Sequence, residues 1–315
     1  MTIRRTCILG LTLLGGAAVG LGAGRSAGAA ETSLRIISLS PHITELLFAA
    51  GAGDRIVGVD DSSDYPAAAA GIARLGEPAA LDVEGLLRLK PTLIVLWDSG
   101  TPALRKAELR RLNLRVYETD QHHLDDIGTT LLEFGRLAGT EPVAAAAARR
   151  YRVELADLRA QYAARPRLKV FFQVWDRPLY TLSGTHIVSE VLSLCGGDNV
   201  FADLPALAPA IDKEAVLARN PEVILIGATG AEGARQTLEW SRFSNLLAVR
   251  EGHVLTVDPS LVSRMGPRIL QGVREICGLL DATRSKRPGT EPPPVGVSRT
   301  GPRPGPPSPI KDNGR

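Results

Sequence analysis

One helix–strand cassette occurs twice in this sequence, and the repeat restricts how the chain can fold. The stretch "DVEGLLRLKPTLIVLW" at residues 82–97 returns as "DKEAVLARNPEVILIG" at residues 212–227, with a constant offset of 130 residues. In both copies an aspartate can cap a helix, a proline ends that helix, and an apolar run typical of a buried strand follows. The last residue differs between the copies, Trp97 in the first and Gly227 in the second. The repeat predicts two related halves of α/β type.

Strand-like and helix-like segments alternate around each copy. The alternation runs over residues 33–138 and again over residues 166–284, and it predicts parallel sheets with helices on both faces. Residues 139–165 have no strand character and are rich in Ala, Arg, Leu and Glu, which favour a helix. We therefore predict an α/β fold with two related lobes joined by one long helix. A single large α/β domain is the alternative interpretation, because all helix–strand units share these patterns.

The two ends of the chain do not follow this pattern. Residues 1–30 contain two adjacent arginines, then an apolar stretch, then small residues, as a secretory signal peptide does. We predict export with cleavage near Ala29 or Ala30, by the general secretory or the twin-arginine route. A membrane anchor is the weaker alternative, because the stretch is short and Gly-rich. Residues 285–315 hold nine prolines and predict a disordered tail.

The charge of the chain is distributed unevenly. The formal net charge is +3, but the two ends together contribute a net +7, which leaves −4 for residues 31–284. A mildly acidic folded body argues against nucleic acid as a partner.

Two cysteines remain once the predicted signal peptide, which contains Cys7, is removed. They are Cys195 and Cys277. An even number of cysteines in an exported protein predicts a disulfide between them. Such a bridge would stabilise the fold by roughly 4 kcal/mol in the chain-entropy model. Two buried free thiols are the alternative.

Aromatic residues at strand ends mark a candidate ligand cleft. Trp97 and Trp175 each follow an apolar strand-like run, and ligands of open α/β sheets bind beyond the carboxyl ends of the strands. Aromatic residues make up only 4% of the chain, so one tryptophan at such an end in each half predicts a cleft with aromatic walls. Tyr65 and Tyr180 are further candidates to line it. Trp240 lies in a helix-like stretch and is expected to pack in the core.

Signals for catalysis or for a metal site are weak. The chain lacks the common nucleotide-binding, zinc-protease and nucleophile-elbow motifs. "DQHHLDD" at residues 120–126 could ligate a metal, but adjacent His122 and His123 point in different directions, and a surface turn that begins a helix is favoured. His42 and His186 also open helices, and a hydrogen-bonded role there is favoured over one in a cleft.

Four segments together resemble a known family. They are "RIISLSPHITELLFAAGAGDRIVGV", "DVEGLLRLKPTLIVLW", "LCGGDNVF" and "DKEAVLARNPEVILI". The combination is similar to the substrate-binding proteins of vitamin B12 (cobalamin) ABC importers, within a helical-backbone group that also carries siderophores and haem. The resemblance extends from about Leu34 to Leu280 and implies class III periplasmic binding protein architecture, with two Rossmann-like lobes joined rigidly by one long helix.

The resemblance also implies a function. It predicts a monomeric periplasmic protein, not an enzyme and without a cofactor of its own, that captures cobalamin or a related corrinoid between its lobes. The protein would then deliver this ligand to the permease of an ABC importer. Haem or a ferric siderophore is the alternative ligand within the same group.

Two pairs of residues acquire roles from the resemblance. Glu84 and Glu214 match glutamates, one on each lobe, that dock onto arginines of the permease, and carboxylate–guanidinium pairs suit such docking. The alternative is that both are merely favourable acids in the first turn of a helix. Cys195 and Cys277 match the disulfide of the family.

Ligand-contact residues carry over less completely. Trp97 matches a cleft tryptophan of the cobalamin binders, and Arg264 matches a cleft arginine. Trp175 and Tyr180 could supply aromatic contacts from the other lobe. They would compensate for three aromatic positions of the family that are here occupied by Ser62, Pro78 and Ala208.

Two other classes of function remain open from the sequence. An exported α/β enzyme could pair His42 or His186 with Asp98 or Asp176, although no nucleophile or metal set accompanies them. A metal-ion binder would need several histidines and carboxylates that converge in the cleft.

Overall fold

The computed structural model describes residues 34–285. The predicted signal peptide (1–30) and the tail beyond residue 285 lie outside the described residues. No helix among residues 34–285 is both long enough and apolar enough to span a membrane.

The N-terminal lobe is built on a five-stranded parallel sheet with the strand order β3-β2-β1-β4-β5. Its strands are β1 (Ile36–Ser38), β2 (Ile56–Val59), β3 (Ala73–Arg74), β4 (Leu93–Trp97) and β5 (Arg115–Thr119). Its helices are α1 (Pro41–Ala49), α2 (Val83–Arg88), α3 (Ala103–Arg111) and α4 (Leu124–Ala138), with short 3-10 turns at Gly53–Arg55, Ala67–Gly71 and Pro78–Ala80.

Helices cover both faces of this sheet because its central strands are apolar on both sides. Ile36 and Val95 pack in one core cluster with α1 and α4, whereas Ile37 and Ile94 pack in another with α2 and α3. The alternation follows the two-residue period of a strand.

The C-terminal lobe has a four-stranded parallel sheet with the order β11-β10-β6-β9 and a separate antiparallel hairpin, β7–β8. The strands are β6 (Leu168–Gln173), β7 (Trp175–Asp176), β8 (Leu179–Tyr180), β9 (Gly197–Asn199), β10 (Val223–Ile226) and β11 (Val254–Thr256). The helices are α6 (Ile187–Leu194), α7 (Lys213–Arg219), α8 (Gly230–Trp240), α9 (Leu247–Arg250), α10 (Pro259–Val262) and α11 (Ile269–Ser285).

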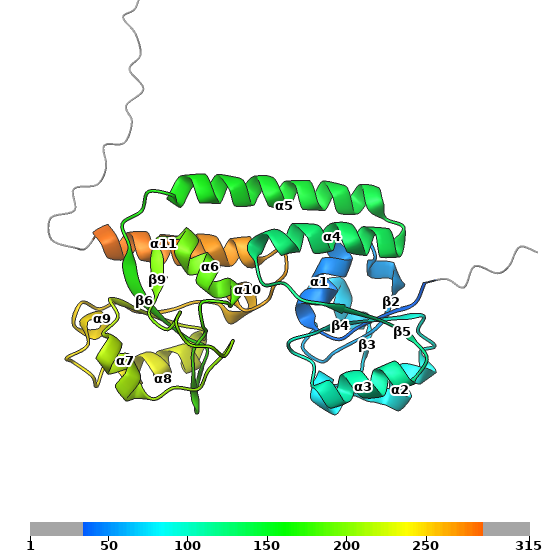
Figure 1. The fold of residues 1–315 in the computed structure, drawn as a ribbon, viewed down its shortest axis with the longest axis horizontal. Coiled ribbons are helices and arrows are strands. Elements are labelled where there is room, and N and C mark those ends of the chain that lie inside the picture. Colours follow the sequence, from blue (N-terminus) through cyan, green and yellow to red (C-terminus); the bar gives the residue numbers. More distant parts are fainter. Residues whose placement is uncertain (1–33, 286–315) are drawn as a thin grey trace, which may run out of the picture. The chain divides into compact units, whose positions relative to one another are not determined.

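The two lobes are connected by helix α5 (Glu141–Tyr162), which runs alongside α4 and α11 (Figure 1). Its buried face includes Ala148, Tyr151, Leu155 and Leu158. One apolar cluster continues from the N-terminal lobe through α4, α5 and α11 into the C-terminal lobe. Shared burial of this kind opposes independent movement of the lobes, because movement would expose apolar surface to water.

The α/β class predicted from the sequence is confirmed, with two lobes of parallel sheet and one long connecting helix. The disulfide is also confirmed. Cys195 follows α6 and is bonded to Cys277 in α11, with Cα atoms 4.7 Å apart. Trp240 is 2% exposed and packs in the core, as expected.

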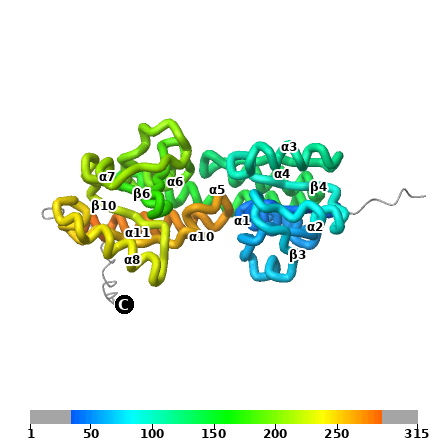
Figure 2. The backbone as a smooth tube through the Cα atoms, turned by 90° about the horizontal axis from the view of Figure 1, so that it is seen from below, coloured from blue at the N-terminus to red at the C-terminus, as the bar shows by residue number. Residues whose placement is uncertain are grey.

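The repeated cassette forms corresponding elements in the two lobes. Asp82 caps α2 by accepting a hydrogen bond from the Gly85 N–H, and Asp212 caps α7 by accepting one from the Ala215 N–H. The following strands, β4 and β10, both have neighbours on either side in their sheets. Figure 2, seen from below, shows α2 in one lobe and α7 in the other.

Candidate functional site

Trp97 is held at the carboxyl end of β4 by three neighbours. Its indole Nε1–H donates to Asp120 Oδ1 at 2.7 Å, and its ring meets the His42 ring edge-on with centroids 5.3 Å apart. The indole also lies directly over the backbone of Gly100, where an added Cβ would be only 1.8 Å from its Cε3 atom. The position of this side chain is therefore determined by the surrounding structure.

Trp97 lines a small pocket between the lobes, which we call the interlobe pocket. Its walls are formed by Trp97, Asp120, Gln121 and His122 of the N-terminal lobe and by Thr185, His186, Ile187, Leu207 and Met265 of the C-terminal lobe. Its cavity volume of about 10 Å³ is far below the roughly 300–1,000 Å³ of most small-molecule sites. The interlobe pocket can therefore hold only part of a large ligand.

The two helix-start histidines near this pocket are hydrogen-bonded and uncharged. The Nδ1 atom of His42 lies 2.7 Å from Ser40 Oγ, and burial lowers the pKa of His42 to about 3. The Nδ1 atom of His186 accepts a hydrogen bond from the Val188 N–H at 3.2 Å, and burial lowers the pKa of His186 to about 4. Desolvation disfavours the charged imidazolium in both cases.

The aspartates that the enzyme hypothesis paired with these histidines lie elsewhere. Asp98 forms an ion pair with Lys106 at 2.5 Å, and Asp176 forms one with Arg235 at 2.6 Å. The structure thus assembles none of these histidine–aspartate pairs within residues 34–285.

Arg264, the candidate ligand arginine, belongs to a network of ion pairs between the lobes. Its guanidinium forms two hydrogen bonds with the Asp64 carboxylate, at 2.5 and 3.2 Å. The buried carboxylate of Glu45 accepts two hydrogen bonds from Arg268, at 2.6 and 3.0 Å, and the Arg268 guanidinium lies 4.0 Å from the ring centroid of Tyr65. The hydrogen bond from Arg264 lowers the pKa of Asp64.

Trp175 and Tyr180 form a third group, on the β7–β8 hairpin. They are paired across its two strands, and Trp175 is 61% exposed. The Trp175 indole N–H donates to the Arg177 carbonyl oxygen at 3.2 Å, while the neighbouring Asp176 is anchored to Arg235 on α8. The five predicted ligand residues therefore lie in three separate groups. Among these five residues, only Trp97 lines the interlobe pocket.

Glu84 and Glu214 are both exposed in the first turns of their helices. Figure 1 shows α2 and α7 on the side of each lobe that is remote from α5. The Glu84 carboxylate lies 2.9 Å from the Arg88 guanidinium. Glu214 forms no ion pair within the described part of the chain.

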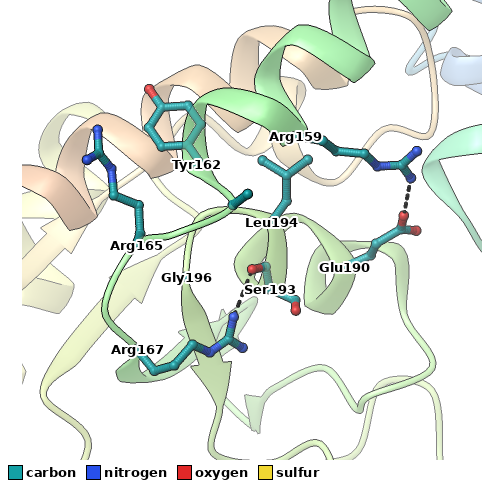
Figure 3. Close-up of a pocket in the computed structure, with 9 residues that line it drawn as sticks. Arg159, Tyr162, Arg165, Arg167, Glu190, Ser193, Leu194 and Gly196 are labelled. Carbon is teal, nitrogen blue, oxygen red and sulfur yellow. Dashed lines mark hydrogen bonds and ion pairs between the residues drawn. The ribbon is translucent and has the colours of Figure 1, made fainter. Parts of the chain in front are cut away.

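A second pocket lies where the end of α5 meets the C-terminal lobe (Figure 3). Three arginines line it, Arg159, Arg165 and Arg167. Each forms an ion pair with a nearby carboxylate: Arg159 with Glu190, Arg165 with Asp281, and Arg167 with Asp198. The pocket therefore does not offer the uncompensated positive charge that an anionic ligand would need.

Several residues that shape these sites were not predicted from the sequence. Asp120 could have been found, because it directly follows the strand β5, as Asp98 follows Trp97 at the end of β4. Glu45 is buried in helix α1, where a charged side chain requires a partner. The metal-binding interpretation of residues 120–126 finds no support, because no group of three or more possible ligands is placed to hold a metal ion within residues 34–285.

Comparison with known proteins identifies the family. The sequence profile of the periplasmic binding proteins matches residues 36–261. The chain belongs to the periplasmic binding protein family. A relative within it, the vitamin B12-binding protein of Vibrio cholerae, is 36% identical over 246 residues, which cover 78% of this chain and 88% of that protein.

Solved structures of periplasmic binding proteins agree with this assignment. The crystal structure of the periplasmic vitamin B12 binding protein of Vibrio cholerae matches with a TM-score of 0.74 and 35% identity, covering 79% of this chain and 97% of that one. A periplasmic heme-binding protein in complex with two hemes matches with a TM-score of 0.71 at 22% identity, covering 79% and 98%. At that identity the comparison shows the fold alone. The resemblance noted in the sequence is thus confirmed.

Proposed function

We propose that this chain is a periplasmic receptor that captures cobalamin, or a related corrinoid, and delivers it to an ABC importer. The observation that carries the proposal is the similarity to the vitamin B12-binding protein of Vibrio cholerae, which spans nearly the whole described body. In this proposal the protein is a monomer, residues 1–30 direct its export, and the Cys195–Cys277 bridge suits an oxidising compartment.

The corrinoid lies between the lobes, with the interlobe pocket at one end of its site. Trp97 presents a partly exposed indole whose orientation is already determined by Asp120, His42 and Gly100. A preorganised aromatic surface binds a flat macrocycle at little cost in conformational entropy. Trp175, on the exposed hairpin, provides a second aromatic surface from the other lobe.

Arg264 contacts a polar substituent of the ligand, and Asp64 competes with the ligand for this arginine. The Asp64 side chain is 66% exposed, so its ion pair with Arg264 is worth at most about 1 kcal/mol. A ligand that supplies its own acceptor can therefore replace Asp64 at small cost. Tyr65 lies beside this network and lines the same side of the ligand site.

Glu84 and Glu214 dock the loaded receptor onto the permease. Each carboxylate is exposed on a helix remote from α5, where a guanidinium of the permease can approach it. Two such pairs, one on each lobe, determine the orientation of the receptor as well as its affinity.

The test of the proposal is a titration of the mature protein with cyanocobalamin, haemin and a ferric siderophore, followed by tryptophan fluorescence and calorimetry. We expect cyanocobalamin to bind with a dissociation constant below about 10 μM. Tight binding of haemin or the siderophore, with no cyanocobalamin binding in this range, would overturn the choice of ligand.

A further inference from the structure

One histidine differs from the other four because it is both exposed to solvent and part of the wall of the interlobe pocket. All five histidines of the sequence lie within residues 34–285. Only His122 both lines the interlobe pocket and is open to solvent, with 55% of its side chain exposed. It stands beside Trp97, which is the side chain proposed to contact the macrocycle.

The remaining imidazoles are unsuitable as ligands of a metal in the bound molecule. His42 is 2% exposed, and His253 is 7% exposed. His186 lines the interlobe pocket, but the lone pair of its Nδ1 already accepts the Val188 N–H. His123 is exposed but does not line the interlobe pocket, and its Nδ1 lies 3.5 Å from Glu190.

A carboxylate is positioned to orient the His122 ring. The Nε2 atom of His122 lies 3.7 Å from Asp120 Oδ2, and Asp120 is itself held by the indole N–H of Trp97 and the hydroxyl of Ser99. The His122 backbone is fixed as well, because its N–H donates to Asp126 at 2.9 Å. Metal-ligating histidines commonly face a carboxylate with one ring nitrogen while the other nitrogen binds the metal.

We propose that the His122 imidazole is an axial ligand for the metal ion at the centre of the bound macrocycle. The proposal rests on the function proposed above and adds a specific bond to it. In a corrinoid with water on its cobalt, the Co–O bond breaks, water leaves with its electron pair, and a ring nitrogen of His122 donates its lone pair to form a Co–N bond. The oxidation state of the metal does not change. Ferric haem offers the same open axial position on iron.

This bond makes the receptor selective for corrinoids with an exchangeable axial ligand. Aquocobalamin carries a labile water, whereas both axial positions of cyanocobalamin are occupied by cyanide and the nucleotide base. We therefore expect the protein to bind aquocobalamin more tightly than cyanocobalamin. Binding of aquocobalamin should also shift its main near-ultraviolet band, as nitrogen coordination does, and cyanocobalamin should show no such shift.

The experiment titrates the mature protein with aquocobalamin, cyanocobalamin and haemin by absorption spectroscopy and calorimetry. Three proteins are compared, the wild type, His122→Ala and the matched control His123→Ala. In His122→Ala the aquocobalamin shift should disappear and the affinity for aquocobalamin should fall by about tenfold or more, a larger factor than any loss of cyanocobalamin affinity. His123→Ala should retain both the shift and the affinity.

The cyanocobalamin arm separates the two proposals. Normal cyanocobalamin binding with no aquocobalamin shift, or with a shift that persists in His122→Ala, would overturn the axial bond and leave the receptor function intact. A His122-dependent shift of the haemin spectrum, without binding of either cobalamin, would support the axial bond and overturn the corrinoid as the ligand. Binding of none of the three compounds would refute both.

Discussion

The α2–β4 unit of the N-terminal lobe and the α7–β10 unit of the C-terminal lobe are alike at one end and different at the other. At the shared end an aspartate caps each helix, Asp82 at 2.8 Å from the Gly85 nitrogen and Asp212 at 2.7 Å from the Ala215 nitrogen. A glutamate follows in the first turn of each helix.

The other end distinguishes the two lobes. β4 finishes in Trp97, which lines the interlobe pocket. β10 is followed by Gly227, whose N–H donates to the Gln173 carbonyl oxygen at 2.8 Å, and a Cβ there would lie only 3.3 Å from the same oxygen. The backbone of the C-terminal lobe thus takes the space from which a side chain would extend.

This difference suggests a division of roles along each unit. A partner that contacts both lobes in the same way requires matching residues, and the capped helix starts supply them. A ligand without internal symmetry requires different residues from each lobe, and the strand ends supply those. We expect changes at the helix starts to affect delivery and changes at the strand ends to affect binding.

The largest effect is expected from removing the matched glutamates together. Glu84→Ala with Glu214→Ala deletes the two charge-assisted pairs proposed with the permease, each worth roughly 1.5–3 kcal/mol, so docking should weaken by at least about a hundredfold. Uptake of labelled cobalamin into cells should be lost. Glu141→Ala, which removes an exposed first-turn glutamate from α5, is the matched control and should transport normally. Uptake that survives the double change would refute the docking role.

The buried histidine beside Trp97 should make the free energy of unfolding depend on pH. His42 is buried next to this indole and its pKa is lowered to about 3, below the ordinary value of 6.5. Because the unfolded chain takes up a proton first, the stability provided by neutral His42 is complete above about pH 6.5 and is lost as the pH falls toward 3, at about 1.4 kcal/mol per pH unit.

Replacement of this histidine isolates its contribution. The wild type should lose about 3 kcal/mol more than His42→Gln between pH 7 and pH 4, measured as the free energy of unfolding in urea. Parallel pH profiles for the two proteins would show that the buried imidazole does not carry this dependence.

A smaller effect is expected from disturbing the backbone under Trp97. Gly100→Ala places a Cβ 1.8 Å from the present position of the indole, so the ring must move. Displacement of a preorganised aromatic contact should weaken cyanocobalamin binding by about tenfold. Gly71→Ala is the control, because nothing lies within 4 Å of the added Cβ. Equal affinities for both variants would indicate that the orientation of Trp97 is unimportant.

The smallest effect on permease binding is expected from a charge difference beside the two matched glutamates. Arg88 pairs with Glu84 at 2.9 Å, whereas the corresponding position of the C-terminal lobe is Ala218. An exposed pair of this kind is worth about 0.5 kcal/mol, so Arg88→Ala should strengthen permease binding about twofold. Ala218→Arg should weaken it by a similar factor, as measured by surface plasmon resonance with the permease in detergent. Weaker permease binding by Arg88→Ala and stronger binding by Ala218→Arg would show instead that Arg88 assists docking.

Local patterns made much of the fold predictable from the sequence. The capped helix starts, the apolar strands and the long alanine-rich helix are encoded over short stretches, where residue preferences act directly. The disulfide could be predicted because only two cysteines remained to be paired. The position of Trp97 at a pocket could be predicted because ligand sites of α/β sheets lie at the edge where β4 ends.

The contacts between the lobes could not be predicted in the same way. Arg264 meets Asp64 across 200 residues, and Arg268 meets Glu45 across 223 residues. Neither pair follows from local propensity, because each depends on how the N-terminal lobe and the segment before α11 are packed together. The packing of the Trp97 indole over Gly100 likewise depends on a ring orientation that no local pattern specifies.

In the proposed division of roles, the strand end of the repeated unit binds the ligand and the helix start does not. Calorimetric titration with cyanocobalamin of the wild type, Trp97→Ala and the Glu84→Ala, Glu214→Ala double variant tests it directly. Loss of the indole should weaken binding by at least about tenfold, because burial of an aromatic side chain contributes roughly 1.5–3 kcal/mol, while the double variant should bind as the wild type does. Wild-type affinity in Trp97→Ala together with weakened binding in the double variant would contradict the account.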